Sequence, residues 1–124
     1  MSKLVWCLVL LVAAVVFVKP LRERVRPEVE IALNPLYNWT VRNEVKDIQR
    51  LVAREQATTG TIPKPSEFER FIDSREGAGA SLDSWGEPYF LTLTRRTYTI
   101  ASAGPDRERN TADDIRTEPA PRTP

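Results

Sequence analysis

The sequence predicts an α+β domain, in which an amphipathic helix is followed by a β-hairpin and an acidic C-terminal loop. Apolar residues recur at helical spacing between residues 39 and 56. After Asp83 the pattern changes to that of strands, and three aspartates follow the second strand. Ahead of this domain, the first 18 residues are almost all apolar. They predict an N-terminal membrane helix, joined to the domain by a stalk.

Composition excludes several classes of function. The chain of 124 residues has a net charge of +1 and no dense basic face, so we expect no nucleic-acid partner. Histidine is absent, which removes the commonest general base. The single cysteine, Cys7, lies in the apolar leader, so neither an internal disulfide nor a multi-cysteine zinc site can form.

Residues 1–19 are predicted to be a membrane anchor or an uncleaved signal. The run from Leu4 to Val18 is about 15 residues long, short of the roughly 20 that span a bilayer, but Lys19 and Arg22 can extend it by snorkelling. A cleaved secretory signal is the alternative, although no small-residue cleavage site precedes Lys19. A buried core helix is a third interpretation.

Two features of the sequence predict opposite membrane orientations. Four basic residues follow the apolar run and one precedes it, which by the positive-inside rule keeps the domain in the cytoplasm. The acidic C-terminal loop, which is a candidate calcium site, favours the opposite side, because calcium is abundant outside the cytoplasm. We give the second argument more weight and expect a single-pass membrane protein with its globular domain outside the cytoplasm.

Residues 20–37 are predicted to form the stalk. Pro20, Pro27 and Pro35 predict short helical pieces there, because proline disfavours helix at and before its own position. The globular domain is expected over residues 38–117. Asn38 is a candidate N-cap for a helix from Trp39 to Gln56. An apolar stripe on this helix would cover the sheet. The stripe consists of Val41, Val45, Ile48 and Val52, and Leu51 widens it.

Two shorter signals follow that helix. Gly60 is a candidate left-handed C-cap. Ser66 and Glu69 have the spacing of a capping box, which predicts a short helix with an apolar edge at Phe68, Phe71 and Ile72.

A β-hairpin is predicted next, with strands over residues 88–93 and 97–102. Alternation places Tyr98 and Ile100 on one face of the second strand. Residues 118–124 are proline-rich and are expected to be disordered.

The loop after the hairpin holds the candidate chemistry. Gly104 and Pro105 predict a tight turn that would bring Asp106 toward the pair Asp113 and Asp114. Clustered carboxylates suit calcium, which takes six to eight oxygen ligands in irregular geometry. An ordinary solvated loop is the alternative. Acid–base catalysis by the aspartate pair has no supporting nucleophile or histidine, so we do not expect an enzyme.

Three segments together resemble the major pseudopilin of type II secretion, the general secretion pathway protein G family. They are Thr59-Gly-Thr-Ile-Pro63, Asp83-Ser-Trp-Gly-Glu-Pro-Tyr89, and the loop from Ser102-Ala-Gly-Pro-Asp106 to Thr111-Ala-Asp-Asp-Ile115. The resemblance covers roughly residues 41–115. It implies an α+β globule in which a long helix packs on a small antiparallel sheet and a calcium loop pins the C-terminal end.

The resemblance also assigns roles to residues. It implies side-chain calcium ligands at Asp106, Asp113 and Asp114, with backbone carbonyls near Ala103 and Arg109 as additional ligands. The residues of the Trp-Gly-x-Pro-Tyr motif have structural roles: Trp85 and Tyr89 are expected in the core, Gly86 permits the turn between them, and Pro88 belongs to the same motif, with Asp83 bracing the turn.

This chain departs from the family at its N-terminus. It lacks the cleavage-site glycine, the Phe-Thr-Leu that follows it and the glutamate of the mature helix, and Ser84 stands where the family has proline. The expectation is a pseudopilin-like domain on a different anchor, and the resemblance implies a place in the bacterial inner membrane with the domain in the periplasm. It would be a non-enzymatic part of a secretion or pilus machinery, with protein partners and self-association as expectations. A membrane-tethered partner-binding module that no longer polymerises is the alternative.

Overall fold

The computed structural model describes residues 2–17 and 19–123. Contacts divide the chain into two units, residues 1–35 and 36–124, which are described separately. The first unit contains helix α1 (Ser2–Phe17) and the beginning of helix α2 (Lys19–Thr59), which continues into the second unit. Across the described ranges, no helix is both long enough and apolar enough to cross a membrane.

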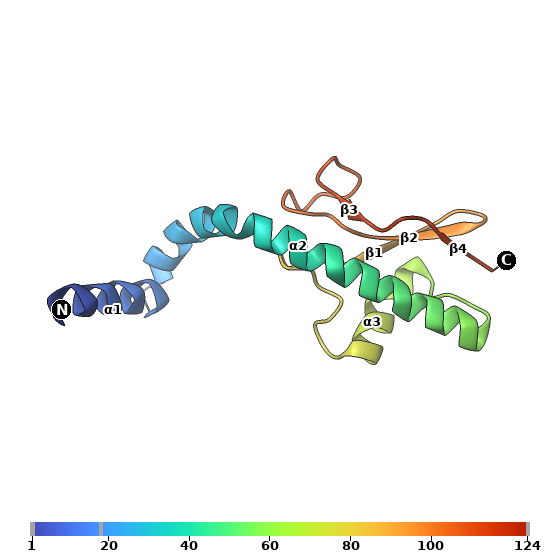
Figure 1. Cartoon of the computed structure of the whole chain (residues 1–124), viewed down its shortest axis with the longest axis horizontal. Coiled ribbons are helices and arrows are strands. Elements are labelled where there is room, and N and C mark those ends of the chain that lie inside the picture. The colour runs from blue at the N-terminus through green and yellow to red at the C-terminus, as the bar shows by residue number, and fades with distance from the viewer. Residues whose placement is uncertain (1, 18, 124) are drawn as a thin grey trace. The chain divides into compact units, whose positions relative to one another are not determined.

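Helix α2 is continuous over its 41 residues (Figure 1). The expectation of short helical pieces is therefore not met, and Asn38 lies inside the helix rather than at its N-cap. Pro20 stands in the first turn, where its missing N–H would have no partner in any case. Pro27 and Pro35 each remove one backbone hydrogen bond, and the bonds of the flanking turns suffice to keep the helix continuous.

The C-terminal end of α2 forms as expected, whereas the next helix begins differently. Gly60 has φ +77° and its amide donates to the Gln56 carbonyl at 2.8 Å, which ends the helix. A 3-10 turn, η1 (Pro65–Glu67), then leads into helix α3 (Phe68–Glu76). Glu67 is the N-cap of α3 and makes no side-chain capping bond, so the predicted capping box of Ser66 and Glu69 does not form. The turn has Lys64 as its N-cap and begins at Pro65, two residues earlier than that box requires.

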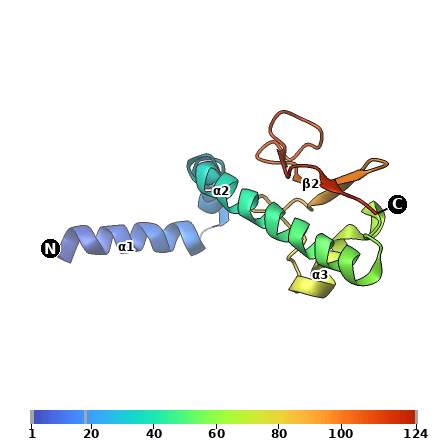
Figure 2. The same cartoon turned by 45° about the vertical axis from the view of Figure 1, so that its right-hand side comes forward.

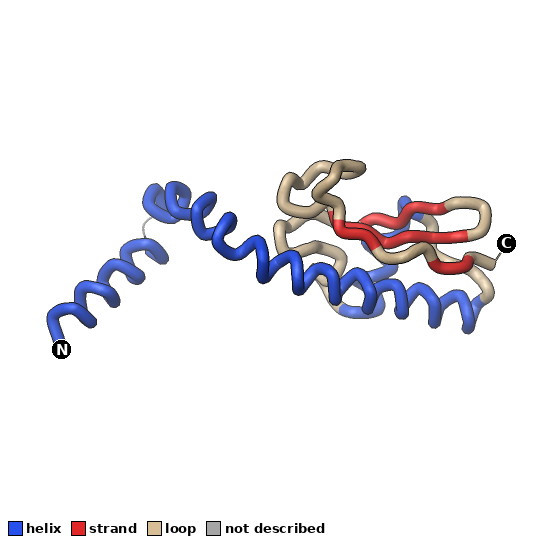
Figure 3. The backbone as a smooth tube through the Cα atoms, turned by 45° about the horizontal axis from the view of Figure 1, so that its top comes forward, coloured by secondary structure: helices blue, strands red, loops and turns tan. Residues whose placement is uncertain are grey.

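A small antiparallel sheet occupies the rest of the second unit (Figure 3). It consists of β1 (Phe90–Leu93), β2 (Thr97–Ser102), β3 (Ile115–Arg116) and β4 (Ala120–Pro121). β1 pairs with β2 over its whole length, as the hairpin prediction requires. Along the other edge of β2, β3 pairs near its end and β4 pairs near its start.

The core lies between α2 and the sheet. The stripe predicted on α2 is buried: Val41 and Val52 are fully enclosed and Val45 is 1% exposed. On β2, Tyr98 and Ile100 face the same core. Helix α3 packs beside β1 and contributes Phe68 and Ile72. The α+β class, with helices packed on a small antiparallel sheet, is thus confirmed.

The C-terminal tail is ordered up to Thr123, although its prolines predicted disorder. Two glutamines of α2 hold it. The Gln49 side-chain amide donates to the Glu118 carbonyl at 2.8 Å, and the Gln56 amide donates to the Pro121 carbonyl at 3.2 Å. The Thr123 amide donates back to Gln56 Oε1. Side-chain partners on the helix thus supplement the short β4 ladder, in which proline cannot donate.

Candidate functional site

The predicted metal loop joins β2 to β3. It lies at one end of the sheet, and the turn between β1 and β2 lies at the other (Figures 1 and 2). Gly104 begins the loop with φ +76°, and a Cβ at this position would collide with the backbone carbonyl of Asp113. Only glycine fits this close approach. The two arms of the loop therefore meet at its base, as the Gly104-Pro105 turn predicted.

Thr111 links two of the three predicted aspartates. Its hydroxyl lies 2.5 Å from Asp106 Oδ2 and 3.4 Å from Asp114 Oδ1. One hydroxyl has a single hydrogen to donate, so it bonds well to Asp106 and only weakly to Asp114. Two carboxylates that are eight residues apart in sequence thereby converge on one small polar group.

Asp114 is enclosed by the loop, with a side chain only 1% exposed. Its Oδ2 accepts from the Asn110 amide at 2.8 Å and from the Arg116 guanidinium at 2.8 Å. Asn110 adopts φ +64°, a conformation that asparagine tolerates better than most residues. The buried charge of Asp114 is therefore compensated from one side, by an arginine that is itself 43% exposed.

Asp106 differs from Asp114 because it is exposed to solvent. The hydrogen bond from Thr111, together with one from the Glu108 amide at 3.0 Å, lowers the pKa of the Asp106 carboxyl below its ordinary value. Both bonds favour the charged form. Asp106 is thus held as a carboxylate at the surface of the loop, where a cation can reach it.

The remaining predicted ligands are not gathered with these two side chains. Asp113 is exposed, and what it brings to the base of the loop is its backbone carbonyl against Gly104. Ala103 is 2% exposed, directly after β2. The Arg109 guanidinium lies 4.8 Å from the centroid of the Phe90 ring. Within the described part of the chain, no three His, Cys, Asp or Glu side chains are grouped closely enough to hold a metal.

The Trp-Gly-x-Pro-Tyr segment forms a turn whose two aromatic side chains lie in the core. Trp85 and Tyr89 are 6% and 1% exposed and belong to the core. Asp83 Oδ1 accepts from the amides of Trp85 at 3.0 Å and Glu87 at 2.9 Å. Gly86 takes φ +85° within this turn, and Pro88 forms a bridge with Leu82. The carboxylate of Asp83 therefore organises the turn through its backbone.

Tyr89 connects the same segment to α2. Its hydroxyl donates a short hydrogen bond to Glu44 Oε2. Burial, with the hydrogen bond to Glu44 second, raises the pKa of the Tyr89 hydroxyl above its ordinary value. Tyr89 therefore stays neutral and acts as a donor that fixes the helix against the sheet.

Sequence reasoning placed Thr111 in the loop without assigning it a role, and it missed Arg116. Thr111 supplies the hydroxyl between two carboxylates, and Arg116 supplies the charge opposite Asp114. A signal for Arg116 was present, because it is the first basic residue after Asp114 and lies two positions along the chain.

No family model matches the chain, and neither a curated protein nor a solved structure shows significant similarity to it. The function must therefore be argued from the residues and their arrangement.

Proposed function

We propose that this protein is a non-enzymatic, pseudopilin-like structural or accessory component of a type II secretion or type IV pilus-like system, tethered to the bacterial inner membrane and stabilised by calcium. One observation carries the proposal. Asp106 and Asp114 converge on the Thr111 hydroxyl, in a loop closed at its base by Gly104 against Asp113.

The chemistry of this loop suits a hard cation. Asp106 and Asp114 supply carboxylate oxygens, and Thr111 supplies a hydroxyl between them. Calcium accepts carboxylates, carbonyls and water in variable numbers, so it does not need three acidic side chains already in place. Asp113 and the backbone carbonyls near Ala103 and Arg109 remain the proposed additional ligands.

Bound calcium would act on stability. It would offset the repulsion between two carboxylates, and it would fix the connection between β2 and β3. Ser102 lies at the base of this connection and is fully buried. A metal that binds only the folded chain stabilises it by about 2.7 kcal/mol at a hundredfold excess over its dissociation constant.

The tether rests on the apolar N-terminus. The described side chains of α1 include Leu4, Leu8 and Leu11, which are 85%, 67% and 64% exposed. A lipid phase would cover such a surface. Placement of the globular domain in the periplasm follows from the proposed calcium site, since calcium is scarce in the cytoplasm.

Calcium-dependent melting tests the proposal. The full-length chain is melted in 1 mM EGTA, in EGTA followed by excess calcium, and in excess magnesium. We expect calcium to raise the melting temperature by on the order of 10 °C, because 1 kcal/mol corresponds to about 4–8 °C in a domain of this size. Magnesium should have a small effect, since it prefers water to protein ligands. Identical curves in all three conditions would remove calcium from the proposal.

Crosslinking distinguishes self-assembly of the protein from binding to a single partner. A ladder of homopolymers after crosslinking in membranes is the outcome expected for a pseudopilin-like subunit. A single heterologous adduct would instead favour a tethered module that binds one partner.

A further inference from the structure

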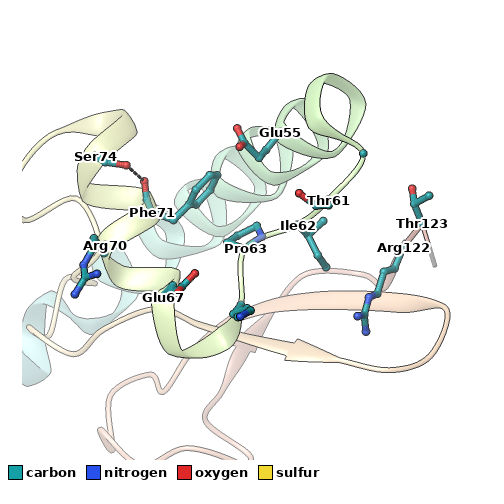
Figure 4. A pocket seen from close by; sticks show the side chains of 12 residues that line it. Glu55, Thr61, Ile62, Pro63, Glu67, Arg70, Phe71, Ser74, Arg122 and Thr123 are labelled. Carbon is teal, nitrogen blue, oxygen red and sulfur yellow. Dashed lines mark hydrogen bonds between the residues drawn. The ribbon is translucent and has the colours of Figure 1, made fainter.

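A second recess lies outside the metal loop and shares no residue with it. It is an open groove of about 860 Å³, bounded by the C-terminal end of α2, the segment after Gly60, α3 and the end of the tail (Figure 4). Its size falls within the range of known ligand-binding clefts, about 300–1,000 Å³. All of its walls belong to the second unit of the chain.

The floor of the groove is apolar and partly exposed. Ile62, Pro63 and Phe71 line it, and Figure 4 shows Pro63 between the other two side chains. Residues 61–64 have no regular secondary structure, and within the described chain no hydrogen bond uses the amide or carbonyl of Ile62. A backbone that is free to pair can take an added extended peptide.

Positive charge dominates the rim. The side chains of Lys64 and Arg70 are exposed and make no hydrogen bond or ion pair within the described chain. Arg122 donates to a neutral group, the Thr94 carbonyl, at 2.9 Å, and it forms no ion pair with another described residue.

The acidic residues of the groove do not cancel this charge. Glu55 is already paired with Arg75 at 2.9 Å, which leaves Glu67 as the one unpaired acid among the lining residues. Counting only ion pairs between described residues, the groove thus carries three unpaired cations and one unpaired anion.

We propose that this groove binds an extended acidic peptide segment of a partner protein. Carboxylates of the peptide would pair with Lys64, Arg70 and Arg122, and its apolar or proline residues would contact Ile62, Pro63 and Phe71. The basic rim and the apolar floor of the groove would thus both be matched by one class of ligand. The proposal does not depend on calcium or on polymerisation, so it can fail or succeed without the proposed function.

A nucleic acid fits these observations less well. Aromatic stacking platforms characterise single-strand binders, and the groove offers one phenyl ring, which Arg75 already covers at 5.7 Å from its centroid. The unused backbone of Ile62 also suits a peptide, which pairs through its own amides.

The test uses fluorescence anisotropy with the full-length chain and a fluorescein-labelled acidic peptide, GLEPELPEG. Its comparison probes are the basic peptide GLKPKLPKG and a labelled oligothymidylate of ten nucleotides. The groove variant is Lys64→Glu with Arg70→Glu. The matched control is Arg42→Glu with Lys46→Glu, which makes the same charge change at two exposed positions of α2 outside the groove.

We expect saturable binding of the acidic peptide that weakens at least tenfold in the groove variant and less than twofold in the control. The Ile62 amide resonance should shift on binding in the wild-type chain. Equal loss in both variants would show general charge attraction and overturn the proposal. So would equal binding of the oligothymidylate or the basic peptide, or no saturation at millimolar acidic peptide.

Discussion

Ser102 Oγ donates a 2.6 Å hydrogen bond to Asp83 Oδ2, and both residues are buried, at 0% and 7% exposed. This bond joins the Trp-Gly-x-Pro-Tyr turn to the base of the metal loop, two motifs that lie 19 residues apart. The same hydroxyl accepts from the Gly104 amide at 3.1 Å. Order in the turn is therefore linked directly to order in the loop.

Replacing Asp83 tests this linkage. Asp83→Ala would remove the carboxylate that accepts from the Ser102 hydroxyl and from the amides of Trp85 and Glu87. Because buried donors without partners cost about 1–3 kcal/mol each, we expect a loss of about 3 kcal/mol in the free energy of unfolding, measured in urea. Asp47→Ala, which removes an exposed carboxylate paired with Arg50, should cost less than about 0.5 kcal/mol. Similar losses in the two variants would contradict the linkage.

Much of this fold was accessible to sequence reasoning because its signals are local. The stripe on α2 and the alternation on β2 follow from the periods of helix and strand, and both correspond to buried residues. Gly60 and Gly86 adopt the positive φ that their positions in a cap and a turn require.

The features that were missed depend on contacts between distant segments. Composition predicted a disordered tail, yet Gln49 and Gln56 hold it from a helix more than 60 residues away. The continuity of α2 through Pro27 and Pro35 likewise depends on the sum of the hydrogen bonds lost and kept over the whole helix. In the loop, the sequence shows that Asp113 is acidic. It does not show that the side chain is exposed, because the exposure depends on how the backbone of Asp113 packs against Gly104.

Asp106 and Asp114 should contribute to the stabilisation by calcium, whereas Glu108, which also lies in the loop, should not. Asp106→Asn and Asp114→Asn are expected to abolish most of the increase in melting temperature that calcium gives. Glu108→Gln is the matched control, because Glu108 contacts Asp106 and Thr111 through its backbone alone. The informative measurement is the difference between melts with and without calcium. Asp114 also bonds Asn110 and Arg116, so its loss lowers stability in EGTA too. A full calcium response in Asp106→Asn would exclude that residue as a ligand.

Gly104 is expected to be far less replaceable than Gly60. Both have φ near +77°, but only at Gly104 would a Cβ strike another backbone atom, the Asp113 carbonyl. Gly60→Ala should cost about 1 kcal/mol, which is the usual strain of a left-handed alanine. Gly104→Ala should cost at least about 2 kcal/mol more, since the arms of the loop must separate. Urea unfolding of both variants gives the difference directly, and equal costs would mean that the loop base is open in solution.

Alkaline pH should weaken the fold through Tyr89. The pKa of its hydroxyl is raised in the folded chain by burial and by Glu44, whereas in the unfolded chain it is near 10. The stabilising contribution is therefore complete below pH 10 and is lost as pH rises beyond it, because only the unfolded chain can then release the proton. One such tyrosine lowers the free energy of unfolding by about 1.4 kcal/mol per pH unit in this range.

Burial also raises the pKa of Tyr98, so the wild-type slope contains two contributions. Tyr89→Phe should be less stable than the wild type at pH 7, by about 1 kcal/mol for the lost hydrogen bond to Glu44. Between pH 10 and 11.5 its stability should fall less steeply, so the two curves converge. Urea unfolding at a series of pH values measures both slopes. Parallel curves would show that the Tyr89 hydroxyl ionises freely in the folded chain, and that its contact with Glu44 does not hold α2 to the sheet.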